Sequence, residues 1–295
     1  MSSNISAIAL SKRKHREPNL YLGGVNKKIG GLITIILVLT VLLPLIFIVT
    51  VSFKNNNEFY TNIWGIPEVW RIENYATAWE QGKIGMFALN SVVVTSTAVL
   101  GSVVLPALAG YALSKMYIPF SEAIIGLLMG LNFVPGVAVH ISLFSQMNAM
   151  GFSKTLWMMI LPYMAWQIPF STFIYKKFFD SISQEILEAA RVDGSSEVYT
   201  FLQIVLPLVT PATATVVVFN FISIWGEYLW ASICCSSSVR TQTLPVGLVN
   251  FKGEYGIEWG PFAAAIVIIV TPLICVFTYF QKYFIQGLTA GAVKG

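Results

Sequence analysis

The stretch that decides the fold class is IGGLITIILVLTVLLPLIFIVTVSF, from Ile29 to Phe53, which contains no charged residue. A helix needs about 20 apolar residues, each rising about 1.5 Å, to cross the hydrocarbon core of a bilayer. This stretch is long enough, whereas the apolar core of a cleavable signal peptide has only about 7–15 residues. It therefore predicts a first transmembrane helix that stays in the protein, preceded by a tail over residues 1–28.

The composition of the whole chain also indicates a membrane protein. The 295 residues are 56% hydrophobic and 11% charged, with a mean hydropathy of +0.71. Soluble domains carry about 25% charged residues, so this composition excludes a water-soluble globule and a disordered chain. The net charge of +4 is too small to indicate nucleic-acid binding. Cys234, Cys235 and Cys275 have neither a disulfide-framework nor a metal-site spacing, and we interpret them as small hydrophobic residues.

Five further apolar segments predict six crossings in all. They run from Gly85 to Leu113, Ala123 to Ile141, Thr155 to Tyr175, Leu208 to Ala231 and Pro261 to Phe280. Asn132, Pro135 and Gly136 interrupt the third segment. Since irregular backbone at membrane depth must be buried in protein or line a cavity, residues 132–136 are the best candidate for a non-helical stretch that lines a cavity. The sequence thus predicts an all-α membrane protein with six transmembrane helices, five of them in a core over residues 85–280.

The basic residues predict the orientation. The loops on the same side as the N-terminus hold 12 Lys and Arg residues, and the loops on the other side hold 6. The positive-inside rule then places both termini, including the tail over residues 281–295, in the cytoplasm. The segment 54–84 becomes external. Its Trp64, Trp70 and Trp79 fit an interfacial aromatic belt or a docking surface, and both interpretations stay open.

The cytoplasmic segment 176–207, KKFFDSISQEILEAARVDGSSEVYTFLQIVLP, predicts two short helices joined by a hinge. Ser181 followed by Gln184 has the form of a capping box, which predicts a helix start at Ser181. Gly194 stands where a helix ends in a left-handed residue, and Ser195 or Ser196 is suited to cap a second helix. Such an element is either a lever moved by a partner protein or an amphipathic helix resting on the lipid headgroups.

The same segment resembles a known family. It fits the pattern EAA-x3-G-x9-I-x-L-P of the permeases of ATP-binding-cassette importers at every defined position: Glu188, Ala189, Ala190, Gly194, Ile204, Leu206 and Pro207. Trp225 to Trp230, Leu244 to Leu248 and Phe280 to Gly295 are similar to stretches of the carbohydrate (MalG-like) permeases, although Gly226 replaces the usual Asn. The resemblance covers essentially the whole chain.

The resemblance implies a type I importer permease fold with a cytoplasmic coupling helix, in the bacterial inner membrane. It implies a second permease subunit as heterodimer partner, two ATPase subunits that hold ATP and Mg²⁺, and an extracellular solute-binding protein that delivers a sugar or oligosaccharide. This chain then binds no cofactor. The residues implied to couple it to the ATPase are Glu188, Ala189, Ala190, Arg191, Asp193, Gly194, Ile204, Leu206 and Pro207. The last three are expected to anchor the second short helix to the bundle.

Two more sets of site residues are expected. In the external loop 234–260, the residues implied to contact the binding protein are Leu244, Pro245, Gly247, Lys252, Gly253, Glu254 and Tyr255. The candidates for the substrate path are Glu227, Trp225, Tyr228, Trp230, Asn220, Asn132, Gln167 and Tyr163. Glu227 is either a surface carboxylate near the outer boundary or a polar group at the outer end of the path. Interhelical hydrogen bonds explain most polar residues in membrane spans, and His140 is one of these polar residues. Trp166 either stacks on a sugar or packs at the lipid interface.

The sequence contains no phosphate-binding G-x-x-x-x-G-K-[ST] loop and no H-E-x-x-H motif, so we expect no catalytic residues and no metal site. The energy for transport must then come from another polypeptide. Two alternatives remain open: an importer permease of the same type for a non-sugar cargo, and a secondary carrier that works alone.

Overall fold

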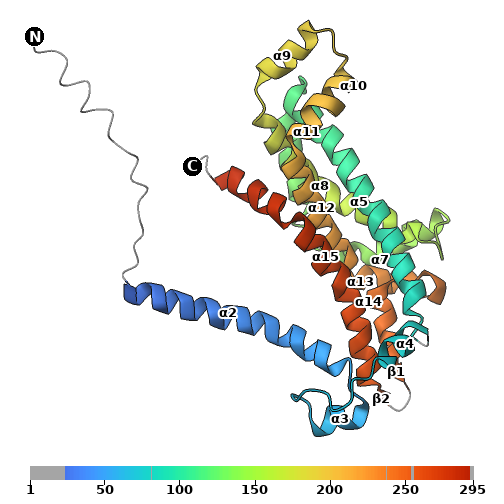
Figure 1. Ribbon diagram of the computed structural model, residues 1–295. Helices are drawn as coiled ribbons and strands as arrows, with labels where there is room; N and C mark the ends of the chain where they lie inside the picture. The colour runs from blue at the N-terminus through green and yellow to red at the C-terminus, as the bar shows by residue number, and fades with distance from the viewer. Residues whose placement is uncertain (1–23, 81, 237, 254–255, 293–295) are drawn as a thin grey trace, which may run out of the picture. The chain divides into compact units, whose positions relative to one another are not determined.

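The computed structural model of the chain describes residues 24–80, 82–236, 238–253 and 256–292. It divides into two compact units, Met1–Phe47 and Ile48–Gly295. The expected first span falls on α2 (Gly24–Val51), which begins in the first unit (Figure 1). An α-helix pairs its own backbone groups, as the bilayer requires. Thr34 and Thr40 donate their hydroxyls to the carbonyl oxygens four residues earlier, so these side chains also need no outside partner.

Four long helices form the bundle of the second unit. They are α5 (Ile84–Lys115), α8 (Trp157–Asp180), α12 (Thr210–Trp225) and α15 (Trp259–Ala292), which run along one another in Figure 1. At Gly110 a Cβ atom would lie 2.8 Å from the Cβ of Tyr175, so the close approach of α5 and α8 requires a residue without a side chain. Tyr175 and Phe179 are fully buried beside this crossing.

The described helices support the prediction of several crossings. Three helical stretches are long and apolar enough to span a membrane: Lys28–Val51, Ile84–Lys115 and Trp259–Lys282. Two bent helix pairs raise the number to five if each pair is one span. The fourth expected span, residues 155–175, falls on α8, which has the length at 24 residues but is less apolar than these five. The expected all-α membrane protein is confirmed, with three to five apolar spans among the described residues, and the sixth crossing stays a prediction.

The third expected span, Ala123 to Ile141, is wrong as a single helix. α6 (Ser121–Leu131) and α7 (Gly136–Ala149) meet at 91°. Pro135 lacks an amide hydrogen and disfavours the helical conformation of the residue before it, which separates the two helices. The expected non-helical stretch is therefore confirmed for residues 132–135, whereas Gly136 already belongs to α7.

The fifth expected span, Leu208 to Ala231, is also wrong as one straight helix. α12 ends at Trp225, Gly226 caps it, and α13 (Leu229–Cys235) begins three residues later. At its other end α12 makes an angle of 76° with the helical stretch Glu197–Leu208.

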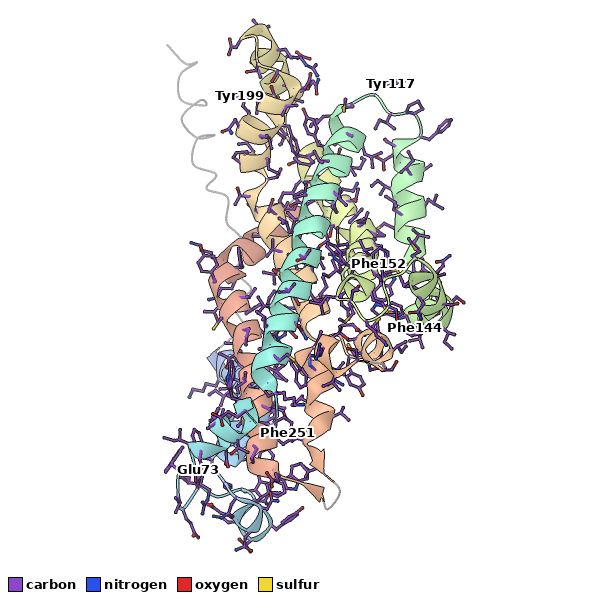
Figure 2. All side chains as sticks on the ribbon, turned by 90° about the vertical axis from the view of Figure 1, so that its right-hand side faces the viewer. Glu73, Tyr117, Phe144, Phe152, Tyr199 and Phe251 are labelled. Atoms are coloured by element: carbon purple, nitrogen blue, oxygen red, sulfur yellow. The ribbon has the colours of Figure 1, made fainter. Side chains whose placement is uncertain are left out.

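The segment 54–84 and the loop 234–260 lie at the same end of the bundle (Figure 2, near Glu73 and Phe251). This end contains α3 (Asn56–Thr61), α4 (Glu73–Glu80), η2 (Val239–Thr241), α14 (Leu244–Gly247), η3 (Leu248–Phe251) and the antiparallel pair β1 (Lys252–Gly253) and β2 (Gly256–Ile257). Lys54 is fully buried and donates its amine to the carbonyl oxygens of Asn62, at 2.5 Å, and Ile63. Asn74 of α4 donates to the carbonyl oxygens of Ser52 and Lys54, so these hydrogen bonds join α4 to the backbone that follows α2.

The opposite end of the bundle, near Tyr199 in Figure 2, carries the segment predicted to form two short helices. α9 (Gln184–Val192) is followed by α10 (Glu197–Tyr199), the π-helix η1 (Thr200–Val205) and α11 (Leu206–Leu208). The expected helix start at Ser181 is wrong, because α8 continues to Asp180 and Ser181 caps its end. Ser183 caps α9 instead, by accepting a hydrogen bond from the amide of Glu185.

Candidate functional site

The end of α9 has the geometry that its glycine predicts. Gly194 has φ of +78°, the amide of Gly194 donates to the carbonyl of Arg191, and the amide of Ser195 donates to that of Ala190. These two bonds form a Schellman motif, which satisfies the last carbonyls of the helix and reverses the chain. Ser196 then caps α10 through the amide of Tyr199. The sequence therefore predicted this hinge correctly.

Replacing Gly194 by alanine is expected to destabilise this hinge by about 1–2 kcal/mol, because a side chain disfavours the left-handed conformation. The matched control is Gly126→Ala in α6, a helical glycine with open space around its Cβ position. That change is expected to be neutral or stabilising by up to about 1 kcal/mol. Thermal unfolding of the two purified variants checks both signs, and equal shifts would count against the role given to Gly194.

The two faces of α9 differ in burial. Leu187 and Ala190, three residues apart, are buried, and Leu187 belongs to the core cluster that contains Phe201 and Tyr111. On the opposite face Glu185, Glu188, Ala189 and Val192 are all exposed.

The expectation that both alanines face a partner is therefore wrong for Ala190. Helical periodicity places it beside Leu187, and it is needed where α9 lies close to its own bundle. Ala189 remains on the exposed face, next to Val192, whose exposed fraction is 88%.

Other members of the coupling set hold the segment together. Arg191 Nε contacts Glu197 Oε1 at 2.9 Å and bridges α9 and α10 across the hinge, while Asp193 is exposed at the C-cap. Both partners of this ion pair are about half exposed, so it contributes little stability. Ile204 and Leu206 are partly buried, as expected for anchors, and Pro207 is exposed.

A charged cluster that we did not predict lies where α5, α6 and α8 meet, below α9. Lys176 Nζ contacts Glu122 Oε1 at 2.6 Å and Asp180 Oδ2 at 3.0 Å, although only 5% of its side chain is exposed. Ser114 donates to Asp180 Oδ1 at 2.7 Å. Lys115 donates to the carbonyl of Ile182 at 2.6 Å, immediately before α9.

Lys176 stays charged in this cluster. Burial acts to lower the pKa of Lys176, but the hydrogen bonds to Glu122 and Asp180 outweigh it, so the pKa is raised and the amine is protonated at neutral pH. The spacing of Lys176 and Asp180 along one helix was a usable signal, whereas the contact with Glu122 depends on the fold.

Glu227 is partly exposed, and both interpretations made from the sequence stay open. It lies in the break between α12 and α13, where its carboxylate accepts hydrogen bonds from the amides of Trp230 and Ala231 at 2.9 and 3.0 Å. The buried hydroxyl of Tyr163 donates to the same carboxylate at 2.5 Å. Glu227 therefore caps the start of α13 and connects it to α8, whereas Tyr163 is 2% exposed and is not free to line a path.

Three more path candidates are also buried inside the chain. Trp225 is 3% exposed and donates its indole N–H to the carbonyl of Ile269, and Trp230 donates to that of Met158. Asn220 is fully buried and bonds to Ser102 and Ser171, which joins α12 to α5 and α8. The assignment of these residues to a substrate path is wrong for this conformation, because interhelical packing and hydrogen bonding occupy them.

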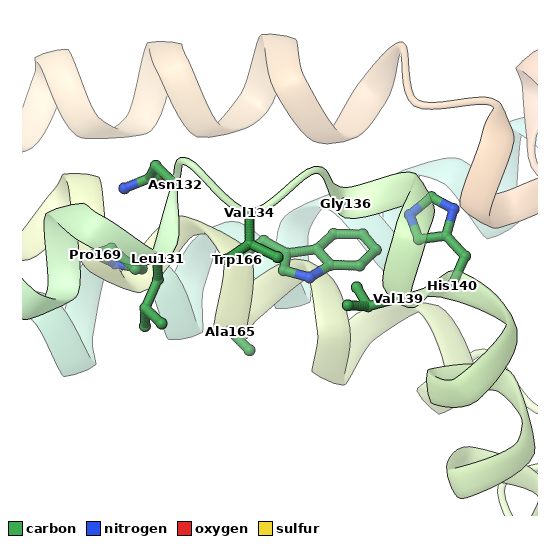
Figure 3. Close-up of a pocket in the computed structure, with 9 residues that line it drawn as sticks. All are labelled: Leu131, Asn132, Val134, Gly136, Val139, His140, Ala165, Trp166 and Pro169. Carbon is green, nitrogen blue, oxygen red and sulfur yellow. The ribbon is translucent and has the colours of Figure 1, made fainter.

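The remaining path candidates are accessible. Tyr228 is exposed, Gln167 donates to the hydroxyl of Ser223 at 2.9 Å, and Asn132 is exposed in the break between α6 and α7. Asn132 is also one of the residues around a cavity of about 470 Å³ at this break (Figure 3). The cavity is lined by Leu131, Asn132, Val134, Gly136, Val139, His140, Ala165, Trp166 and Pro169.

The residues expected to contact a binding protein differ in their exposure. Leu244 and Gly247 are buried, and a Cβ on Gly247 would collide with the ring of Phe87. These two residues pack into the bundle and are not free for docking, while Pro245 is partly exposed. Lys252 and Gly253 form β1, and Glu254 and Tyr255 lie outside the described residues.

Within the described ranges no group of three or more His, Cys, Asp or Glu side chains is arranged to hold a metal ion. What the structure presents is a membrane-embedded helical bundle with an exposed hinged helix at one end and a cavity at a broken helix. This arrangement defines a multi-span helical membrane protein.

The comparisons with known proteins agree with this class. Residues 131–290 match the family described as the binding-protein-dependent transport system inner membrane component. The chain is 34% identical to the probable ABC transporter permease protein YurM of Bacillus subtilis over 85% of this chain and 83% of that protein. It is 32% identical to the trehalose/maltose transport system permease protein MalG of Thermococcus litoralis, over 88% and 94%.

A bacterial ABC transporter of known structure, involved in the import of the acidic polysaccharide alginate, has the same fold. It superimposes with a TM-score of 0.77 at 22% identity, over 88% of this chain and 96% of that chain. The chain belongs to the family of binding-protein-dependent transport system inner membrane components. Subunits of this kind are permeases and not themselves enzymes, so the expectation of a non-enzymatic ABC importer permease is confirmed.

Proposed function

We propose that this chain is one permease subunit of an ATP-driven importer that moves a sugar or oligosaccharide into the cytoplasm by alternating access. A trehalose/maltose permease among its relatives supports the carbohydrate cargo. The proposed assembly contains a second, different permease, two ATPase subunits that hold ATP and Mg²⁺, and an extracellular solute-binding protein. Both termini and α9 lie on the cytoplasmic side, as the distribution of basic residues favours.

The observation that carries the coupling role is the exposed face of α9. This face carries the carboxylates of Glu185 and Glu188. The apolar side chain of Val192 lies beside them, together with the small side chain of Ala189. Ala189 lets a partner surface approach the helix backbone, Val192 offers an apolar contact, and the carboxylates suit basic groups of the ATPase.

Two covalent routes lead from α9 into the membrane. One runs through Ser183 to the end of α8 and the charged cluster around Lys176. The other runs through the Gly194 hinge and η1 to α12. A displacement of α9 by the closing ATPases then moves α8 and α12 together, and these two helices pack against each other and against α5.

Ala189→Trp tests this role directly. We expect the variant to fold and insert normally but to lower the ATP hydrolysis stimulated by binding protein and sugar about tenfold, because the indole prevents close docking of α9. The matched control is Ala149→Trp, at an exposed alanine at the end of α7. Equal stimulated activity in the two variants would contradict the coupling role of α9.

The cargo is tested with the same reconstituted complex. We expect one neutral or acidic oligosaccharide, with its binding protein, to stimulate ATP hydrolysis and to accumulate in vesicles only when ATP is present. Stimulation by a peptide, amino-acid or lipid binding protein instead would identify the alternative cargo class. Flux through vesicles that contain this chain alone, without ATP, would identify a secondary carrier.

A further inference from the structure

The cavity at the break between α6 and α7 contains a polar group that the fold leaves without a partner. His140, in α7, is 7% exposed, and within the described residues its imidazole makes ring contacts but no hydrogen bond. The ring nitrogens of His140 are not among the fully buried unpaired atoms of the described residues, so they are available to a ligand in the cavity. The ring lies at the edge of the cavity (Figure 3), with Nε2 near Gly136, 3.7 Å from where a Cβ would be.

The position of this imidazole is fixed by aromatic neighbours. Its ring centre lies 5.5 Å from that of Trp166 and 5.4 Å from that of Trp230, and the two indoles lie 5.7 Å apart. Trp230 is itself held by its hydrogen bond to the carbonyl of Met158. The unpaired histidine is therefore preorganised and is not a side chain free to find another partner.

The rest of the lining suits one kind of ligand. The indole of Trp166 lies across the cavity and Asn132 stands at its other end (Figure 3). The remaining lining residues are Gly136 and the apolar Leu131, Val134, Val139, Ala165 and Pro169, and no lining residue carries a formal charge. An aromatic face with a few hydrogen-bonding groups fits a ring that is apolar on its faces and bears hydroxyls at its edge.

The lining contains no Lys or Arg, which discriminates between sugars. Burying an ionised carboxylate without a positive partner is costly. In the described part of the chain, the Lys, Arg, Asp or Glu side chain that hydrogen bonds and ring contacts join to this aromatic cluster is Glu227, through Tyr163, and it is acidic. A uronate would meet no compensating charge here, whereas a neutral sugar needs none.

We infer that the cavity is a sugar subsite of this subunit and that it receives a neutral pyranose residue of the cargo. The pyranose lies on Trp166, and His140 and Asn132 bond to its hydroxyls. This inference rests on the proposed function, since it assigns the carbohydrate class and a contact site to the proposed importer. The inference also explains the break between α6 and α7, because residues of this break line the cavity.

The test uses the complete complex in vesicles and four neutral sugars, maltose, trehalose, melibiose and diacetylchitobiose, beside alginate oligosaccharides as the uronate probe. We expect the wild-type complex to take up at least one neutral sugar in an ATP-dependent manner and to take it up faster than the uronate. Trp166→Ala and His140→Ala should each lower the uptake of that sugar about tenfold, the effect of losing one strong contact. Trp166→Phe, which keeps an aromatic face, should retain most of it.

Trp157→Ala is the matched control, because Trp157 is an exposed tryptophan of the same helix, α8, outside the cavity lining. Uptake by Trp166→Ala and His140→Ala at the rate of Trp157→Ala would overturn the subsite and leave the proposed importer intact. Preferential uptake of alginate oligosaccharides would overturn the neutral-sugar assignment. Loss of the partner permease during purification of Trp166→Ala would assign the cavity to that subunit instead, and ATP-dependent uptake of no sugar by the wild type would overturn the proposed function as well.

Discussion

Replacing Glu227 by leucine is expected to lower the stability of the permease by about 4 kcal/mol, the largest effect of any single change considered. Its carboxylate accepts hydrogen bonds from the amides of Trp230 and Ala231 and from the hydroxyl of Tyr163. Leucine leaves all three donors without an acceptor, and each unsatisfied buried donor costs about 1–3 kcal/mol. The start of α13 then loses its cap and its connection to α8.

The midpoint of thermal unfolding of the purified complex measures this effect, with an expected decrease of roughly 10 °C. Glu227→Gln retains one acceptor oxygen and should be less damaging. Tyr163→Phe removes one donor together with its bond and should cost only about 1 kcal/mol. Glu80→Leu, at an exposed glutamate in α4, is the control for the loss of a carboxylate. A Glu227→Leu variant as stable as Glu80→Leu would show that the carboxylate does not hold this junction.

Reversing the charge of Lys176 is expected to have the second-largest effect. Lys176→Glu places a third carboxylate between Glu122 and Asp180, at the point where α6 and α8 meet below α9. Breaking a fully buried ion pair costs about 3–5 kcal/mol, and the cost here is lower because Glu122 and Asp180 are 74% and 36% exposed. Because Asp180 also accepts from Ser114, the end of α5 loses its connection too. We expect ATP hydrolysis by the assembled complex to lose its stimulation by binding protein and sugar.

The neighbouring Lys177 provides the matched control, since it is exposed and only approaches the ring of Phe173, at 5.8 Å. Lys177→Glu should leave stimulation unchanged. The double variant Lys176→Glu, Glu122→Lys restores one ion pair. It should recover part of the ATP hydrolysis that binding protein and sugar stimulate. Stimulation in Lys176→Glu equal to that in Lys177→Glu would exclude a role for the cluster in transmitting motion from α9.

The hinge of the cytoplasmic segment shows what local chemistry predicts well. Gly194 ends α9 in the left-handed conformation because only a residue without a Cβ adopts it at no cost. The same reasoning misplaced the start of α9 by two residues, because Ser181 and Ser183 are both competent caps and the register of α8 decides between them.

The cavity and the Glu227 junction show where local chemistry is insufficient. The sequence identified Asn132 to Gly136 as an irregular stretch, since proline and glycine disrupt a helix wherever they occur. It did not show that His140 and Trp166 enclose a cavity beside it, because these residues come from α7 and α8 and their contact depends on the 91° bend. Similarly, Glu227 was recognisable as unusual, but its three donors come from α8 and α13.

The sequence by itself determined that this protein is a helical membrane protein, because apolar length acts locally and needs no tertiary contact. It also determined the hinge of α9, through one glycine. Only the tertiary structure decided that Ala190 is buried, that Lys176 of α8 pairs with Glu122 of α6, and that Trp225, Trp230 and Asn220 are packing residues. The physical reason is that burial and pairing depend on which helix lies opposite, and this is a property of the packed bundle.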